Sequence, residues 1–194
     1  MIIGLTGGIG SGKSIIANQL QKMGYAVYDT DREAKRLIIE EAKVRQQMEQ
    51  VFGKEIYVNN VYQTALVAQR AFADELLLTQ LNAIVHPAVK ADIIRWASSE
   101  GKDDLLFVEC AILYQAGFDS LCDKVVEVTA PEETRIERVI ARDHSTIDKV
   151  RARIRAQRTE NELPRADLVV NNDGKTEITA ICLQIQDFFR NFAG

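Results

Sequence analysis

The chain has 194 residues, which is room for one compact domain with an inserted segment. Its composition, 46% hydrophobic and 27% charged, is that of a soluble globular protein, and its net charge of −4 argues against a general nucleic-acid binder. No apolar run approaches the roughly 18 residues that span a bilayer, and no basic segment precedes the apolar first residues, so we expect no membrane span and no signal peptide. The three cysteines form no C-x-x-C pair, so we expect reduced thiols in a cytoplasmic protein.

The first predicted elements are a strand at 2–6 and a helix that begins at Lys13, and a glycine-rich loop joins them. Residues 7 to 14 read Gly-Gly-Ile-Gly-Ser-Gly-Lys-Ser, which fits the phosphate-binding pattern G-x-x-x-x-G-K-[S/T]. In such a loop Lys13 would reach the β- and γ-phosphates of ATP, and the Ser14 hydroxyl would bind Mg²⁺. We expect the nucleotide to contact Gly8, Gly10, Ser11, Gly12, Lys13, Ser14 and Ile15.

Four further apolar segments predict strands at 25–29, 105–110, 124–128 and 167–170. Segments with helical spacing alternate with them, which predicts an α/β fold of the P-loop NTPase type: a five-stranded parallel sheet in a three-layer α/β/α arrangement. In such sheets ligands bind beyond the carboxyl ends of the strands, so residues that follow a strand are candidates for the site.

The second predicted strand ends in Asp29-Thr30-Asp31, which places two carboxylates at the ligand edge. A kinase that phosphorylates an alcohol needs a carboxylate to accept the hydroxyl proton, and Asp31 is our candidate for that base. Asp29 would orient the acceptor or hold Mg²⁺ through water. The alternative is that one of these residues only caps the helix that follows. Glu109 ends the third strand and is a second candidate for holding Mg²⁺ through water.

About seventy residues separate the second and third strands, whereas a simple crossover needs about a dozen. They predict helices at 33–40, 42–52, 64–72 and 76–98, with Pro87 breaking the last one. We therefore divide the chain into a kinase core, 1–31 and 102–194, and a helical acceptor-binding subdomain, 32–101. His86 lies beside the predicted break, and capping or packing and contact with the acceptor are equally good interpretations of it.

After the fourth strand, a helix over 131–142 carries Arg135, Arg138 and Arg142 on one stripe, and a second Arg-rich helix follows. Such a lightly packed hairpin near a phosphate site predicts a lid, about 142–160, that would bring Arg142 to the transferred phosphoryl group. A solvated basic face is the alternative for most of these arginines. The loop after the last strand, with Asn172 and Gly174, would lie against the base of ATP, or it is only a turn. The last helix, about 175–192, has the spacing of a core-facing helix.

Together these segments resemble the bacterial dephospho-coenzyme A kinases, over nearly the whole chain and in order. The matching segments are Gly4–Ser14, Asp29–Asp31, Leu81–Pro87, Arg138–Asp143, Ala156–Gln157 and Ala166–Asn171 with Gly174. The resemblance implies that ATP phosphorylates the ribose 3′-hydroxyl of dephospho-coenzyme A, the last step of coenzyme A synthesis. It also implies that Lys13 and Ser14 serve ATP–Mg²⁺, that Asp31 is the base and that Arg142 is a lid arginine. The chain departs from the family at Gln115, where a glutamate is usual.

Two other functions remain open at this point. One is a P-loop kinase for a nucleoside monophosphate or another alcohol, which only the family pattern disfavours. The other is a GTP-dependent switch, but the D-x-x-G and N-K-x-D patterns of such switches do not occur in the chain. For the dephospho-coenzyme A kinase we expect ATP and dephospho-coenzyme A as the partners, Mg²⁺ as the cofactor, no nucleic acid or membrane partner, and a monomer or weak homo-oligomer.

Overall fold

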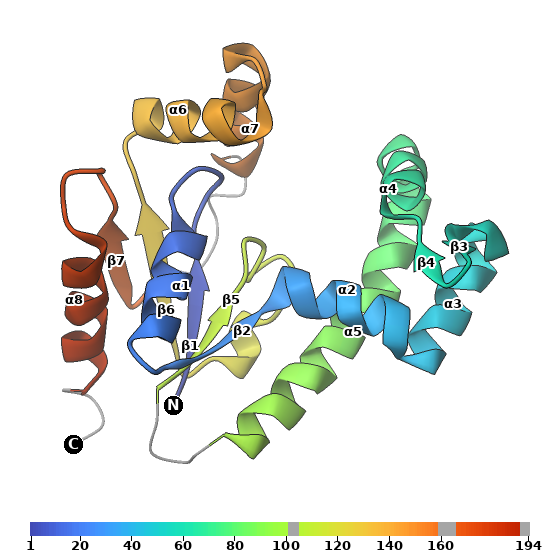
Figure 1. Cartoon of the computed structure of the whole chain (residues 1–194), viewed down its shortest axis with the longest axis horizontal. Coiled ribbons are helices and arrows are strands. Elements are labelled where there is room, and N and C mark those ends of the chain that lie inside the picture. Colours follow the sequence, from blue (N-terminus) through green and yellow to red (C-terminus); the bar gives the residue numbers. More distant parts are fainter. Residues whose placement is uncertain (101–104, 159–165, 191–194) are drawn as a thin grey trace. The chain divides into compact units, whose positions relative to one another are not determined.

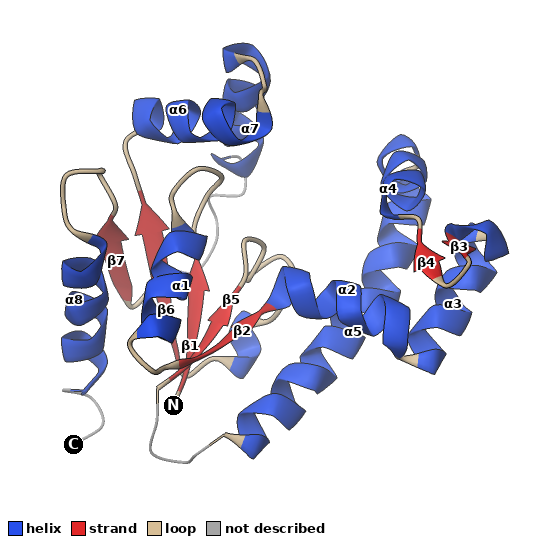
Figure 2. Ribbon diagram, in the orientation of Figure 1, coloured by secondary structure: helices blue, strands red, loops and turns tan. Residues whose placement is uncertain are grey.

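The computed structural model describes residues 1–100, 105–158 and 166–190, and it divides into two compact units (Figure 1). We call residues 1–28 with 100–194 the sheet unit and residues 29–99 the helical unit. Figure 2 shows that the large sheet belongs to the first and that the second is mostly helical. In the part of the chain that is described, no helix combines the length and the apolar character needed to cross a membrane.

The sheet has five strands in the order β2-β5-β1-β6-β7. Strand β1 pairs in parallel with β5 and with β6, and β6 pairs in parallel with β7. The five strands predicted from apolar runs are all present, and the central place of β1 sets the loop after it in the middle of the carboxyl edge. The strands are β1 (Ile2–Thr6), β2 (Ala26–Asp29), β5 (Leu106–Glu109), β6 (Lys124–Thr129) and β7 (Leu168–Asn171).

Helices α1 (Lys13–Lys22) and α8 (Ile178–Arg190) pack against each other and share one apolar core with the sheet. Ile3 and Leu5 of β1 and Phe107 of β5 are fully buried in this core. The predicted last helix, 175–192, is therefore present but shorter; positions 191 and 192 lie outside the described residues. Its expected role as a core-facing helix is confirmed by the burial of Ile181, Cys182, Ile185 and Phe189.

The opposite side of β1 is covered closely at Gly4. A Cβ atom there would lie 2.7 Å from Leu113 Cδ2 and 3.1 Å from Cys122 Sγ. Both side chains belong to a stretch of turns that contains one short 3₁₀ helix, η2 (Asp119–Leu121). A glycine in the middle of a strand is thus explained by the close approach of this segment.

Helices α6 (Glu132–Asp143) and α7 (Ile147–Arg158) form the hairpin that we expected as a lid. They have a small apolar core of their own, made of Ile136, Val139, Val150 and Ile154, and Ile9 of the glycine-rich loop packs against it. The expected lid, 142–160, thus begins in the last turn of α6, and its positions 159 and 160 lie outside the described residues.

In the helical unit, the four helices expected between the second and third strands are present. They are α2 (Thr30–Glu40), α3 (Ala42–Phe52), α4 (Thr64–Ala73) and α5 (Glu75–Ser99). The expectation that Pro87 breaks the last helix is wrong, because α5 continues through it. A proline inside a helix costs about 3 kcal/mol, and packing of α5 against α2, α3 and α4 opposes this cost. Leu81, Ile84, Val85 and Ala88, on both sides of the proline, contact the core of the unit.

A short 3₁₀ helix, η1 (Lys54–Ile56), leads into a two-stranded hairpin that the sequence analysis did not predict. Its strands are β3 (Tyr57–Val58) and β4 (Val61–Tyr62). Asn59 and Asn60 between them have φ values of 51° and 63°, as the two central residues of a type I′ turn require. The signal was present in the run Tyr-Val-Asn-Asn-Val-Tyr, since asparagine tolerates this conformation and the flanking residues favour strands.

Two phenylalanines offer a matched test of the core. Phe107 of β5 is fully buried, whereas Phe72 of α4 is 81% exposed. Phe107→Ala should lower the free energy of unfolding by about 3–5 kcal/mol, because it leaves a cavity in the sheet-unit core. Phe72→Ala should change it by less than about 0.5 kcal/mol. Denaturant unfolding followed by circular dichroism measures both, and equal losses would contradict this description of the core.

Candidate active site

The glycine-rich loop joins β1 to α1, and two of its glycines are required by its geometry. Gly12, at the N-cap of α1, has a φ of 87°, and its carbonyl accepts hydrogen bonds from Ile15 N (3.0 Å) and Ile16 N (3.2 Å). A Cβ atom on Gly12 would lie 2.1 Å from Asn172 Nδ2. Gly10 has a φ of 77°, and its Cβ would lie 2.5 Å from the Arg135 carbonyl oxygen. Both positions therefore exclude a side chain, and the loop leads directly into the N-terminus of α1, where anions bind.

Two arginines of α6 donate hydrogen bonds to carbonyl groups of the loop. Arg135 Nε donates to the Ile9 carbonyl at 2.8 Å. Arg138 Nη1 donates to the carbonyls of Gly10 (3.4 Å) and Ser11 (3.2 Å). Because N–H and C=O of a planar trans peptide point in opposite directions, these bonds turn the N–H groups of the same peptide units away from the two arginines.

Arg138 and Asn172 form a second layer under the loop. Asn172 follows β7 and is fully buried, and its Nδ2 donates to the Ser11 carbonyl at 2.9 Å. Arg138 Nη2 donates to Asn172 Oδ1, and Nη1 donates to the Asn172 carbonyl, both at 3.2 Å. A Cβ on Gly174, whose φ is 83°, would lie 3.5 Å from Arg138 Nη2. The structure thus brings Asn172 and Gly174 to the loop, and it uses the Asn172 amide inside the protein.

The sequence analysis missed this role of Arg135 and Arg138, although it placed both on one stripe of α6 with Arg142. Their helical spacing was the available signal, because it sets one row of guanidinium groups on the same side of the helix. The spacing does not tell what this side of α6 faces, because the loop carbonyls belong to residues more than 120 positions earlier in the chain.

Lys13 and Ser14, in the first turn of α1, share one partner. Lys13 Nζ donates to Glu109 Oε1 at 2.5 Å, and Ser14 Oγ donates to the same oxygen at 2.6 Å. The Lys13 and Glu109 side chains are only 12% and 9% exposed. Glu109 reaches them because β5 pairs with β1 in a register that sets Glu109 opposite Leu5, just before the loop. The predicted Lys13, Ser14 and Glu109 are therefore brought together.

The oxygens of Ser14 and Glu109 suit a hard cation such as Mg²⁺, which keeps several waters and binds one or two protein oxygens together with phosphates. No group of three or more His, Cys, Asp or Glu side chains that could hold a metal occurs within 1–100, 105–158 and 166–190. Ser14 and Glu109 thus offer two protein oxygens to such a cation.

Ser11 and Ile15, two further residues that we expected to contact the nucleotide, differ in burial. Ser11 is buried, with 1% of its surface exposed, and its backbone N–H donates to the Gly8 carbonyl at 3.0 Å. Ser11 Oγ has no hydrogen-bond partner among the described residues. Ile15, in the first turn of α1, exposes half of its side chain.

At the end of β2, Asp29 caps α2. Its Oδ1 accepts hydrogen bonds from Asp31 N and Arg32 N, both at 3.0 Å. The capping alternative thus holds for Asp29, while Asp31 lies in the first turn of α2 with an exposed side chain.

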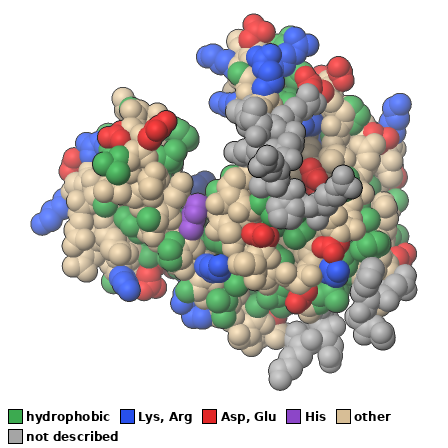
Figure 3. All heavy atoms as spheres, turned by 180° about the vertical axis from the view of Figure 1, so that it is seen from behind, with side chains coloured by type: hydrophobic (Ala, Val, Ile, Leu, Met, Phe, Trp, Pro, Cys, Tyr) green, Lys and Arg blue, Asp and Glu red, His purple; other side chains and the backbone are tan. Residues whose placement is uncertain are grey.

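Arg142, in the last turn of α6, is exposed and binds its neighbour. Its Nε donates to Asp143 Oδ1 at 2.7 Å and its Nη2 donates to Oδ2 at 3.1 Å. This pairing raises the pKa of Arg142 and lowers that of Asp143. Figure 3 shows Lys and Arg side chains gathered over α6 and α7. Among the side chains of the hairpin that the structure describes, the exposed cations are Arg142, Lys149, Arg151, Arg153 and Arg155.

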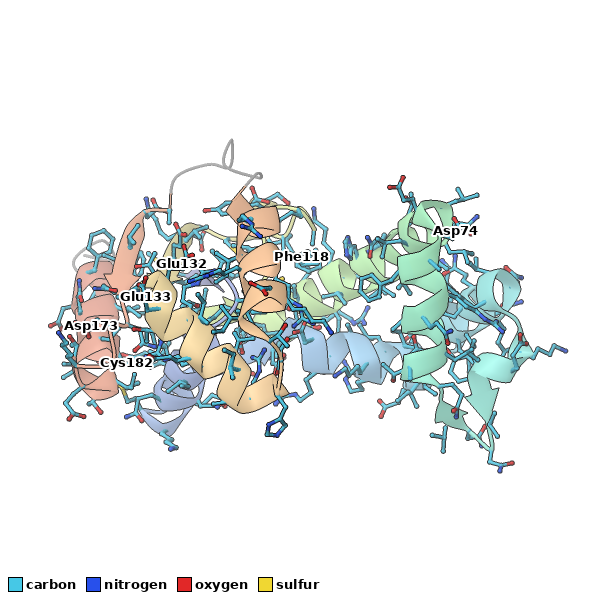
Figure 4. The ribbon with its side chains drawn as sticks, turned by 90° about the horizontal axis from the view of Figure 1, so that it is seen from above. Asp74, Phe118, Glu132, Glu133, Asp173 and Cys182 are labelled. Atoms are coloured by element: carbon cyan, nitrogen blue, oxygen red, sulfur yellow. The ribbon has the colours of Figure 1, made fainter. Side chains whose placement is uncertain are left out.

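The loop after β7 is held by a turn around Asp173, which Figure 4 labels. Asp173 Oδ1 accepts hydrogen bonds from the backbone N–H groups of Lys175 (2.8 Å) and Thr176 (2.9 Å). The bonds from Thr176 and Lys175 lower the pKa of Asp173. The loop that carries Asn172 and Gly174 is thus a turn with a defined geometry.

In the helical unit, His86 lies inside α5 rather than at a helix end, and partial burial lowers its pKa. The next residue, Pro87, lines a pocket of about 350 Å³ between α2, α3 and α5. Most of its wall is apolar, with the cations Lys43 and Arg95 and the anion Glu41 among the lining residues. The full lining is Leu37, Glu41, Lys43, Val44, Gln47, Ala83, Ile84, Pro87, Ala88, Ala91 and Arg95.

Known proteins resemble this chain in sequence and in fold. The dephospho-CoA kinase of Porphyromonas gingivalis is 43% identical over 164 residues, which cover 84% of this chain and 81% of that protein. A crystal structure from Thermus thermophilus, 32% identical, matches with a TM-score of 0.80 over 96% of this chain and 95% of the other. Shikimate kinase from Aquifex aeolicus, 18% identical, has a TM-score of 0.55 over 100% of this chain and 98% of its own, a likeness of fold alone. The expected P-loop NTPase-type fold is thereby confirmed.

The family model described as dephospho-CoA kinase matches residues 1–177. This span includes the glycine-rich loop, Glu109, both arginines that bind the loop carbonyls, and Asn172. The resemblance found in the sequence is therefore confirmed, and the chain belongs to the dephospho-CoA kinase family.

Proposed function

We propose that this chain transfers the γ-phosphoryl group of ATP to the ribose 3′-hydroxyl of dephospho-coenzyme A, which yields coenzyme A and ADP at the last step of coenzyme A synthesis. The observation that carries the proposal is the phosphate loop, with Lys13 and Ser14 at the start of α1, in a chain of this family. The names of the similar proteins support the choice of acceptor.

ATP would bind through the N–H groups of the loop and of the first turn of α1, with Lys13 reaching its β- and γ-phosphates. Gly8, Gly10, Gly12 and Ser14 would contribute backbone N–H groups. Ser11 and Ile15 would contribute only by sharing theirs, which already donate to the carbonyls of Gly8 and Gly12. Gly174 has no side chain and would leave room beside the loop after β7 for the base of ATP. Asn172 would act on the nucleotide through the Ser11 carbonyl that it binds, since its side chain is fully buried.

Mg²⁺ would be held by the Ser14 hydroxyl and, through water, by Glu109. Asp29 is a further candidate for a water-mediated contact, although its Oδ1 already caps α2. When bound, the cation would neutralise charge on the transferred phosphoryl group.

The chemical step would use Asp31 as the base. Its carboxylate would accept the proton of the 3′-hydroxyl as that oxygen bonds to the γ-phosphorus, and the bond to the β–γ bridging oxygen breaks to release ADP. Two observations support this choice: Asp31 is exposed in the first turn after β2, and β2 belongs to the sheet whose β1 leads into the phosphate loop. Lys13 would stabilise the charge on the transferred group, and Arg142 would join it by exchanging Asp143 for phosphate when the lid closes.

The acceptor would bind in the helical unit. The pocket between α2, α3 and α5 combines an apolar wall with two cations, which suits a substrate that has both an apolar arm and phosphates. His86 precedes a residue of this wall and is our candidate for a further contact. In this proposal the acceptor-binding subdomain expected from the sequence, 32–101, selects the acceptor, and 1–31 with 102–194 is the kinase core.

The first prediction concerns the acceptor. ADP release from ATP–Mg²⁺ should depend on dephospho-coenzyme A, and mass spectrometry should show coenzyme A as the product. Nucleoside monophosphates assayed in parallel should give no comparable release. ATP binding without phosphorylation of dephospho-coenzyme A would keep the kinase fold but reject this acceptor.

Asp31→Asn tests the base. A positioned general base contributes about 10²–10⁴-fold to rate, so kcat should fall by at least about 100-fold, while the Kd for ATP stays within about twofold. Asp187→Asn, which removes one exposed carboxylate from α8, is the charge-matched control and should keep wild-type kcat. A wild-type kcat in Asp31→Asn would remove Asp31 as the base.

Asn172→Ala tests the support under the loop. The change deletes a buried hydrogen bond to the Ser11 carbonyl and leaves Arg138 without the Asn172 side-chain oxygen, so ATP affinity should fall about tenfold. The neighbouring Asn171→Ala, at an exposed position of β7, should bind ATP as the wild type does. Titration calorimetry measures both, with circular dichroism as the check of folding. Equal affinities in the two variants would show that Asn172 has no part in shaping the loop.

A further inference from the structure

One carboxylate oxygen binds the two side chains that nucleotide and metal would need. Glu109 Oε1 accepts from Lys13 Nζ at 2.5 Å and from Ser14 Oγ at 2.6 Å. In the proposed function Lys13 serves the phosphates and Ser14 serves the cation. Glu109 therefore sets a negative charge directly beside the two groups that these ligands would use.

The burial of the pair makes the electrostatic effect of this charge strong. The Lys13 and Glu109 side chains are 12% and 9% exposed, so their attraction is screened less than that of a surface pair. A polyphosphate that binds Lys13 meets an ammonium group whose positive charge Glu109 already offsets. Without a metal, that polyphosphate would also sit next to an unneutralised carboxylate, which repels it.

The effect of Glu109 on nucleotide affinity reverses when the nucleotide carries a divalent cation. Glu109 can then exchange its contacts with Lys13 and Ser14 for water on the cation, and its negative charge becomes favourable. The same side chain thus opposes one form of the nucleotide and supports the other, which is how a site gains specificity from a repulsive element.

We propose that Glu109 makes this site select metal-bound ATP over metal-free ATP, because its negative charge lies beside Lys13 and Ser14 and repels the polyphosphate until a cation offsets it. The inference rests on the proposed function for the identity of the nucleotide. It goes beyond that function because it assigns to Glu109 a role against the metal-free ligand in addition to water-mediated support of the metal.

The test is the Kd for ATP, measured by titration calorimetry with excess EDTA and with excess Mg²⁺. In the wild type, Mg²⁺ should tighten binding. In Glu109→Gln, metal-free ATP should bind about tenfold more tightly than in the wild type, because a repulsive charge is lost, while the Mg²⁺ complex should bind more weakly. Glu137→Gln removes an exposed carboxylate from α6 and should keep the wild-type ratio of the two constants.

Because Glu109→Gln leaves Lys13 with a neutral partner and lowers stability, Glu109→Asp provides a second test. It keeps the charge but shortens the side chain by one methylene, so metal-free ATP should bind more tightly than in the wild type and less tightly than in Glu109→Gln. Wild-type protein that binds metal-free ATP as tightly as the Mg²⁺ complex would overturn the inference. So would an unchanged metal-free affinity in the Glu109 variants that fold.

These outcomes are separable from those of the proposed function. Failure to phosphorylate dephospho-coenzyme A, with the wild-type ratio of binding constants intact, would reject the acceptor and leave the role of Glu109 standing. Equal binding of the two nucleotide forms in a protein that makes coenzyme A would reject only the role of Glu109.

Discussion

The structure depends on a property of the peptide group: its N–H and C=O point in opposite directions. A loop that directs N–H groups toward an anion must direct carbonyls away from it, and these need donors when they are covered by protein. Arg135, Arg138 and Asn172 supply those donors to the carbonyls of residues 9–11. Helix α6 and the loop after β7 are thereby tied to the strand–loop–helix unit at the other end of the sequence.

Charge imposes a second constraint on the same loop. Lys13 is largely buried, and a buried ammonium group needs a partner. The pairing of β1 with β5 sets Glu109 opposite Leu5, so its carboxylate supplies that partner and also accepts from Ser14. The order of the strands therefore sets the loop at the middle of the carboxyl edge of the sheet. It also sets the carboxylate of Glu109 beside the ammonium group of Lys13.

Features that follow from short stretches of sequence were predictable. The five strands follow from apolar runs, and the loop follows from a motif whose glycines have no room for side chains. The continuity of α5 through Pro87 was not predictable, because tertiary packing overrides a local propensity. The roles of Arg138 and Asn172 were hidden for a related reason, since they depend on contacts between residues more than 120 positions apart. Asp29 had two open interpretations, and its hydrogen bonds to the start of α2 show the capping one.

The attachment of α6 to the loop also limits how the Arg-rich hairpin can move. Gly10 has no room for a Cβ against the Arg135 backbone, and Arg138 donates to two loop carbonyls. The first half of α6 is therefore attached to the phosphate loop. Arg142, one turn later, is 64% exposed and bound only to Asp143 among the contacts described for it. A lid closure that keeps the hydrogen bonds of Arg138 would have to pivot after that residue. The moving part would then be shorter than the hairpin, and a hinge that brings Arg142 to the phosphate would lie within one helical turn of it.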